Sequence, residues 1–313
     1  MKRNKIIWII ITVLLFQVAC VKDPLEYIET GEWNNERSIL DIKFENQVGK
    51  AEINRIDEST GEIIISINID AVPNLSNIVL ESVQLSYDAK SSLNVGQSLS
   101  FENPDKSAVV EVTSPTGKVR EYTIIANSFQ EMLLGTYNIT DLVVYGGTGP
   151  EYGGAAVLSM TSKPWVWLET GGPEAELDNT LTFTLSGITD EGNTYGKIVN
   201  DPGTDEMYAN FLFTRDPETD VNHFYRKIPM GEGVWTRNYA NGTISIEFPD
   251  GATSVCRLIE AGVQDMGHGK SKTTTDYALE FSLSGTDDWT NIYSDYDKFV
   301  KRPRRYWIDM TKE

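Results

Sequence analysis

The residues best suited to binding chemistry in this sequence are aromatic side chains that lie beside glycines and acidic residues. Trp165 and Trp167 flank Val166, so a strand through this segment would place both indoles on one face. Sugar rings stack their apolar C–H faces on aromatic planes, and Asp or Asn side chains bind the hydroxyls. Core packing of the same rings is the alternative. The other candidate ligand-binding residues are Tyr145, Tyr152, Trp235, Tyr239, Trp289, Tyr293 and Tyr296.

Nucleophilic and nucleotide chemistry have little support. His223 and His268 are the only histidines, and the sequence has no Gly-x-Ser-x-Gly elbow. Cys256 lies among apolar residues, which indicates a buried thiol rather than a nucleophile. The Gly-Lys-Ser at residues 269–271 lacks the earlier glycine of a phosphate loop, because Gln264 stands there. We therefore predict no catalytic residue.

Acidic residues leave two further alternatives open. Glycoside hydrolysis needs two carboxylates roughly 5–9 Å apart, whatever their sequence spacing. The candidates are Glu169, Glu174, Asp205, Glu206, Asp287 and Asp288. The acidic loops at residues 201–206 and 216–220 offer oxygen ligands suited to Ca²⁺, although neither matches the twelve-residue helix–loop–helix register. We predict no cofactor and no metal site, with a structural Ca²⁺ as the alternative.

The N-terminus has the pattern of a targeting segment. Lys2, Arg3 and Lys5 precede an apolar run at residues 6–16, which is shorter than the roughly 20 residues that span a bilayer. Residues 16–20, Phe-Gln-Val-Ala-Cys, resemble a relaxed bacterial lipobox, with Gln17 where Leu is usual. The resemblance implies a signal peptide at residues 1–19 and a lipidated Cys20. We expect a lipid-anchored protein of the outer membrane, exposed at the cell surface, with a cleaved secreted protein as the alternative.

The charge balance restricts the partners. The chain holds 27 basic and 46 acidic residues, a net charge of −19, and loss of residues 1–19 would leave 24 basic residues and a net charge of −22. Nucleic acid is an implausible partner, because phosphate binding needs clustered Lys and Arg. The membrane is expected as a partner only through the anchor, and other envelope proteins remain candidates. Two cysteines exclude a disulfide scaffold.

Period-two patterns predict an all-β protein of two domains. After a tether at residues 20–37, Leu40, Ile42 and Phe44 alternate with polar residues, and seven short strands follow within residues 38–127. That spacing predicts an immunoglobulin-like sandwich. A junction at 127–134, possible as a short helical turn, leads to residues 134–313, where about ten strands must close into a barrel or pair into a sandwich. Its predicted strands include 136–144, 165–168, 180–186, 195–199, 209–213, 224–228, 243–248, 254–258, 278–283 and 305–310.

Two short motifs in the second domain carry a resemblance. Residues 134–137, Leu-Gly-Thr-Tyr, resemble the Gly-x-Trp start of lipocalin-like barrels, and residues 145–154 are rich in glycine. Together with the lipobox, the tether and the first module, this resembles uncharacterised surface lipoproteins of polysaccharide-degrading Gram-negative bacteria. The resemblance implies a glycan-handling setting and assigns no catalytic residue. We therefore expect non-catalytic carbohydrate binding, with structural adhesion to a protein and glycoside hydrolysis as alternatives.

Overall fold

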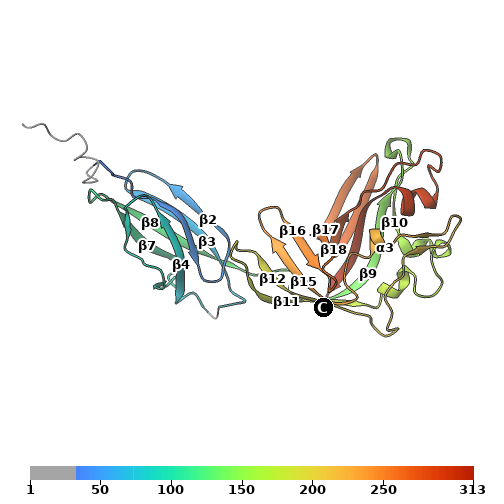
Figure 1. The fold of residues 1–313 in the computed structure, drawn as a ribbon, viewed down its shortest axis with the longest axis horizontal. Coiled ribbons are helices and arrows are strands. Elements are labelled where there is room, and N and C mark those ends of the chain that lie inside the picture. The colour runs from blue at the N-terminus through green and yellow to red at the C-terminus, as the bar shows by residue number, and fades with distance from the viewer. Residues whose placement is uncertain (1–32, 73) are drawn as a thin grey trace, which may run out of the picture. The chain divides into compact units, whose positions relative to one another are not determined.

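The computed structural model of the chain describes residues 33–72 and 74–313, and these residues form two compact units (Figure 1). The first unit holds most of the described residues up to Asn127. The second contains Ser128–Glu313 together with Asn46–Lys50 and a short segment after Ile65. Both units are built from antiparallel strands, which confirms the predicted all-β class. Cys20 and the tether up to residue 32 lie outside the described residues.

The first unit contains two antiparallel sheets. One has the order β1 (Ile39–Phe44), β4 (Ile78–Leu85), β6 (Ser98–Leu99). The other has the order β2 (Gln47–Arg55), β3 (Thr60–Asn68), β8 (Val119–Phe129), β7 (Ser107–Thr113), β5 (Lys90–Ser91). Alternate residues of the strands are buried, as Ile63, Ile65 and Ile67 in β3 show. The amide of Ile39 donates to the hydroxyl of Tyr122 at 3.3 Å, which links a strand of one sheet to a strand of the other. This arrangement is a β-sandwich.

The second unit is a closed barrel of eight antiparallel strands in sequential order. The strands are β9 (Gly135–Gly146), β11 (Thr180–Ile188), β12 (Thr194–Asp201), β15 (Gly231–Asn238), β16 (Thr243–Glu247), β17 (Thr253–Gly267), β18 (Lys270–Ser282) and β19 (Pro303–Lys312). β19 pairs with β9, which closes the barrel and leaves no unpaired edge between them. The short β10 (Ala156–Ser159) pairs with the end of β9. Of the predicted alternatives, the structure therefore has the up-and-down barrel and not the jelly roll or the sandwich.

Bulky side chains fill the barrel interior. Tyr137, Phe183 and Trp235 form a chain of edge contacts, with ring centroids 5.9 Å apart in the first pair and 6.4 Å in the second. Trp235 has no exposed surface, and its indole N–H donates to the carbonyls of Thr184 and Lys197, each at 3.1 Å. The prediction of Trp235 as a ligand-binding residue is therefore wrong. Its segment is β15, a strand of the barrel, where inward positions belong to the core.

The long connections of the barrel lie at one end. Three join β9 or β10 to β11, β12 to β15, and β18 to β19, whereas the turns at the other end are short. Two predicted strands fall in these long connections and are wrong. Residues 165–168 overlap the 3₁₀ turn η4 (Pro164–Val166), and residues 224–228 begin in the helical turn α3 (Asn222–Tyr225). In the part of the chain that the structure describes, no helix is long and apolar enough to cross a membrane.

Candidate carbohydrate-binding site

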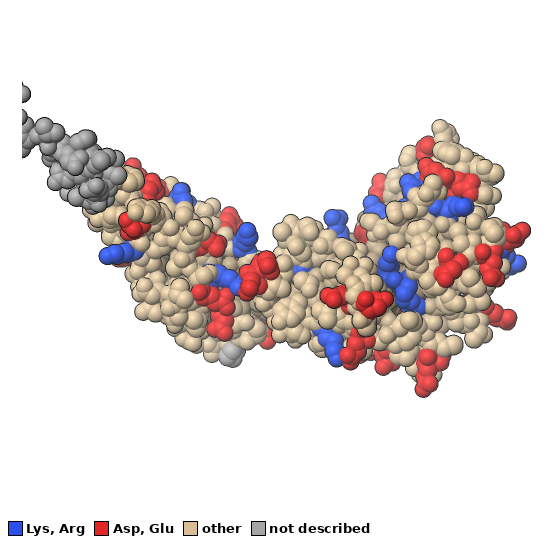
Figure 2. Space-filling view, viewed as in Figure 1, with Lys and Arg blue, Asp and Glu red and all other residues tan. Residues whose placement is uncertain are grey.

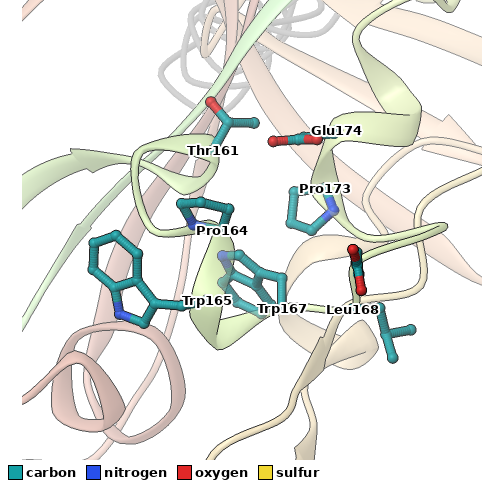
Figure 3. A pocket seen from close by; sticks show the side chains of 8 residues that line it. Thr161, Pro164, Trp165, Trp167, Leu168, Pro173 and Glu174 are labelled. Atoms are coloured by element: carbon teal, nitrogen blue, oxygen red, sulfur yellow. The ribbon is translucent and has the colours of Figure 1, made fainter.

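A pocket of about 360 Å³ lies among the long connections at this end of the barrel (Figure 3). Trp167 is buried at its base, and Figure 3 shows Pro164 and Pro173 on either side of that indole. Apolar surface therefore forms most of the interior, and polar groups are confined to a few side chains. The residues that line the pocket are Thr161, Pro164, Trp165, Trp167, Leu168, Glu169, Pro173 and Glu174.

Proline decides how the two tryptophans are oriented. Pro164 begins the 3₁₀ turn η4, in which the amide of Trp167 donates to the carbonyl of Pro164 at 3.2 Å. In this turn the side chains of Trp165 and Trp167 do not share a face, contrary to the strand prediction. Trp165 is 52% exposed, whereas the Trp167 ring is buried and its indole N–H donates to the carbonyl of Met160 at 3.0 Å. The pocket thus has a fixed aromatic base and an exposed aromatic side chain at its edge.

A second group of exposed aromatic rings is formed by the loops at residues 147–155 and 283–296. The rings of Tyr152 and Trp289 meet at 6.0 Å between centroids, and the hydroxyl of Tyr293 donates to the carbonyl of Tyr152 at 3.3 Å. More than half of the surface of each of these three residues is exposed. Gly149 permits this packing, since a Cβ at that position would lie 3.0 Å from the Trp289 ring. Three of the predicted ligand-binding residues are therefore brought together at the surface.

A buried carboxylate holds these two loops together. Asp297 has no exposed surface and accepts hydrogen bonds from the amide of Thr148 at 2.6 Å and from its hydroxyl at 2.8 Å. The amide of Asp288 in turn donates to the same Thr148 hydroxyl at 2.7 Å. These hydrogen bonds join the loop that carries Tyr152 to the loop that carries Trp289.

Lys163 connects the pocket with the second aromatic loop. Its ammonium group lies 3.3 Å from a carboxylate oxygen of Asp295 and 5.1 Å from the centroid of the Trp165 ring. Asp295 follows Tyr293 in the same loop, so the ion pair joins the segment that carries Trp165 to the segment that carries Tyr293. The result is a surface at one end of the barrel with aromatic rings, a lysine and several carboxylates.

The remaining predicted ligand-binding residues have structural surroundings. Tyr145 is buried on the outer side of the barrel against Trp307 and its neighbours. Tyr239 is half-buried, and its hydroxyl bonds to Glu131 and Thr194, near the short turns at the other end. Tyr296 is half-buried and packs on Phe213 with ring centroids 5.6 Å apart. The structure therefore brings none of Tyr145, Tyr239 and Tyr296 into the pocket lining, since each ring is engaged in contacts within its own unit.

The predicted carboxylate candidates separate into two kinds. Glu169 and Glu174 are exposed and both line the pocket. Asp287 is paired with the guanidinium groups of Arg302 at 2.8 Å and Arg304 at 3.3 Å, so it holds its loop to the start of β19. Hydrogen bonds, chiefly from the side chain of Asn291, lower the pKa of Asp288, which caps a turn. Within the described residues no three His, Cys, Asp or Glu side chains gather closely enough to hold a metal ion.

Five residues take part in this site and were not predicted from the sequence. They are Thr161, Lys163, Pro164, Leu168 and Pro173. The sequence carries one signal for them, since Lys163 and Pro164 directly precede the Trp-Val-Trp segment. A proline at this position argues against a central strand and for a turn. Pro173 carries no such signal, because only the fold of the connection brings it opposite Pro164.

Comparison with known proteins gave partial similarities to solved structures. No protein-family model matches the chain, and no curated protein sequence matches it. A crystal structure described as a "putative secreted protein" from Bacteroides fragilis NCTC 9343 is similar to part of the chain, with 15% sequence identity and a TM-score of 0.23. The similarity covers 30% of this chain and 96% of that chain.

Proposed function

We propose that this protein is a surface lipoprotein of the outer membrane whose barrel binds carbohydrate without catalysis. The observation that carries the proposal is the pocket with Trp167 at its base and the exposed Trp165 at its edge. An indole offers a flat apolar face for the C–H side of a sugar ring, while Thr161, Glu169 and Glu174 can accept hydrogen bonds from hydroxyls. The volume of about 360 Å³ falls within the roughly 300–1,000 Å³ of small-ligand sites.

The second aromatic group supports a ligand longer than one sugar unit. Tyr152, Trp289 and Tyr293 present exposed rings from loops that Lys163 and Asp295 connect to the pocket segment. Exposed aromatic rings that cluster on a surface typically mark a binding site, because their burial in a complex removes apolar area from water. An oligosaccharide that leaves the pocket along these loops would find further rings to stack on.

Removal of the exposed indole tests the proposed site. For the chain from Val21 to Glu313, we expect retarded migration in gels that contain a bound polysaccharide, and about tenfold weaker affinity after Trp165→Ala. The stability of the variant should not change, because Trp165 is exposed. Affinity electrophoresis over a panel of neutral polysaccharides measures the affinity of the unchanged chain and of Trp165→Ala.

Tyr87→Ala is the matched control, since this ring is 74% exposed but belongs to the first unit. Equal losses for Trp165→Ala and Tyr87→Ala would refute the assignment of the pocket. No retardation on any polysaccharide, together with capture of a protein partner, would favour the adhesion role instead.

The membrane anchor is tested at Cys20. Each buried methylene of an acyl chain contributes about 0.8 kcal/mol, so two or more chains give stable attachment. We expect radiolabelled palmitate to appear on the protein in a Gram-negative host, and Cys20→Ser to lose both the label and co-fractionation with the outer membrane. Cys256→Ala is the control, because the Cys256 thiol is buried and should carry no acyl chain. Persistent membrane association of Cys20→Ser would exclude the acyl anchor.

Glycoside hydrolysis is the second candidate function, favoured by the exposed side chains of Glu169 and Glu174 at one pocket. Two carboxylates that flank a bound sugar are the minimum for this chemistry. Release of reducing ends from a polysaccharide that binds, lost in both Glu169→Gln and Glu174→Gln, would establish the hydrolase. Binding that persists in these variants with no release of reducing ends would support the non-catalytic role.

A further inference from the structure

The β17–β18 hairpin covers part of the outer wall of its own barrel. Strand pairing shifts register between Glu260 and Gly262, and the part of the hairpin beyond this bulge contacts β19 from outside. Trp307 points outward from β19, since its neighbours Tyr306 and Ile308 belong to the interior cluster. It is nevertheless fully buried in an outer cluster of Val143, Tyr145, Ala155, Ala278 and Trp307, with Val157, Ile259 and Met266 packed against it.

A hydrogen-bonded chain fixes this arrangement. The indole N–H of Trp307 donates to the side-chain oxygen of Gln264 at 3.1 Å, and the Gln264 amide donates to Glu280 at 3.0 Å. Glu280 also accepts from the guanidinium of Arg305 at 2.8 Å. The wall of β17, β18 and β19 therefore presents a fixed row of polar groups beside the folded hairpin.

A groove of about 570 Å³ runs along this wall. Its cationic lining residues, Lys227, Arg257 and Arg305, outnumber the single acidic one, Glu280. The chain as a whole has a net charge of −19, and acidic side chains are spread over the face of both units in Figure 2. The positive charge of this groove is thus opposite to the net negative charge of the protein. The other lining residues are Thr243, Thr253, Ser254, Val255, Cys256, Ile259, Gln264, Phe281 and Ser282.

Two of the three cations have no carboxylate partner. Arg257 is exposed and makes no ion pair within the described residues. The ammonium group of Lys227 donates to the carbonyl of His223 at 3.0 Å and, in the same part of the chain, to no carboxylate. Burial lowers the pKa of Lys227, so its charged form would gain from an anion nearby. Arg305 differs, because it already pairs with Glu280.

We propose that this groove binds an acidic saccharide, with its carboxylate or sulfate groups on Arg257 and Lys227. Arginine binds such planar or tetrahedral anions through two N–H groups, and these charge-assisted hydrogen bonds are the strong ones. Thr253 and Ser282 can donate to or accept from sugar hydroxyls beside the charged group. Nucleic acid fits less well, since the only aromatic lining residue, Phe281, is buried and offers no ring for base stacking.

This inference is independent of the proposed pocket at the loop end. The two sites share no lining residue, since the pocket is formed by residues 161–174 and the groove by residues 227–305. The pocket is apolar with acidic residues at its edge, and the groove is polar and cationic. A neutral glycan in the pocket and an acidic one in the groove would therefore bind separately.

Charge reversal at Arg257 tests the groove. We expect the chain from Val21 to Glu313 to bind polygalacturonate or dextran sulfate more tightly than uncharged dextran, with an affinity that falls as NaCl rises. Arg257→Glu should weaken binding at least about tenfold, and Arg257→Lys should weaken it less, because the charge remains while the paired N–H groups are lost. Isothermal titration calorimetry of the wild type and the two variants measures these affinities, and the two polyanions distinguish carboxylate from sulfate recognition.

Lys118→Glu is the matched control, because Lys118 is exposed in the first unit and the substitution changes the net charge equally. It should change the affinity less than about twofold, which corresponds to less free energy than one hydrogen bond typically contributes. Equal weakening by Lys118→Glu and Arg257→Glu would overturn the proposal in favour of non-specific attraction, as would failure of both polyanions to bind. Trp165→Ala should leave polyanion binding unchanged, so a failure of the groove is distinguishable from a failure of the pocket.

Discussion

Trp235→Ala is expected to destabilise the barrel by about 3–5 kcal/mol, the usual loss when a large aromatic side chain is removed from a core. Trp235 is fully buried, packs on Phe183 and donates from its indole to one backbone carbonyl of β11 and one of β12. Truncation would leave a cavity and remove both hydrogen bonds. Urea unfolding followed by tryptophan fluorescence measures the change, since residues 134–313 contain most of the tryptophans of the chain.

Trp165→Ala is the matched control for this experiment. It removes the same side chain from a position that is 52% exposed, so the free energy of unfolding should stay within about 0.5 kcal/mol of the wild type. The two variants should therefore show opposite behaviour, one with lost stability and the other with lost glycan binding. Similar stability of both variants would contradict the interior position of Trp235.

Arg237→Ala is expected to cost about 3 kcal/mol, because it would leave a buried carboxylate without its ion-pair partner. The side chain of Glu131 is fully buried and accepts from the guanidinium of Arg237 and the hydroxyl of Tyr239. It also accepts from the hydroxyl of Thr194 at 2.7 Å and the amide of Leu133 at 3.0 Å. Urea unfolding at neutral pH measures the loss. Lys197→Ala is the control, because its pair with Glu232 is exposed and worth about 0–1 kcal/mol.

The pH dependence of this loss follows from the carboxyl of Glu131. Burial by itself raises its pKa, but hydrogen bonds from Tyr239, Thr194 and Leu133, with the charge of Arg237, outweigh burial and lower the pKa below its usual 4.5. A pKa that is lower in the folded state gives stability that is present above pH 4.5 and is lost as the pH falls below it. The difference between the wild type and Arg237→Ala should therefore shrink in acid. The pH range from 7 to 3 includes the usual pKa of 4.5. If the difference in the free energy of unfolding stayed constant over this range, this role of the ion pair would be contradicted.

Local patterns predicted most of the strands. The alternation of Leu40, Ile42 and Phe44 with polar residues matches β1 (Ile39–Phe44), and the predicted strand at residues 195–199 lies within β12 (Thr194–Asp201). Period-two burial is a property of one strand on one sheet, so it can be read without knowledge of the partner strands. Strands in the barrel such as β11, β16 and β19 were found in the same way.

Glycines concealed β15. The sequence around Trp235 contains Gly231 and Gly233 and resembles a loop, and the structure explains why a strand carries them. In the neighbouring β12, a Cβ at Gly196 would lie 3.0 Å from the indole nitrogen of Trp235 and closer still to the carbonyl of Thr184. Gly196 thus gives room for the Trp235 ring, and Gly233, whose Cβ would lie 2.8 Å from the carbonyl oxygen of Glu247, permits close backbone approach in the closed barrel. That requirement comes from strands distant in sequence and has no local pattern.

The sequence by itself determined the acidic charge, the all-β class and the set of aromatic residues from which a binding surface could be made. The tertiary structure decided which of these rings face solvent. Trp165, Tyr152, Trp289 and Tyr293 are exposed, whereas Trp235, Tyr145 and Trp167 are buried by barrel closure and by the folding of the long connections. The physical reason is that the alternation of apolar and polar residues lies along the chain, while exposure depends on contacts such as β19 with β9, which join residues as far apart in sequence as Tyr137 and Lys312.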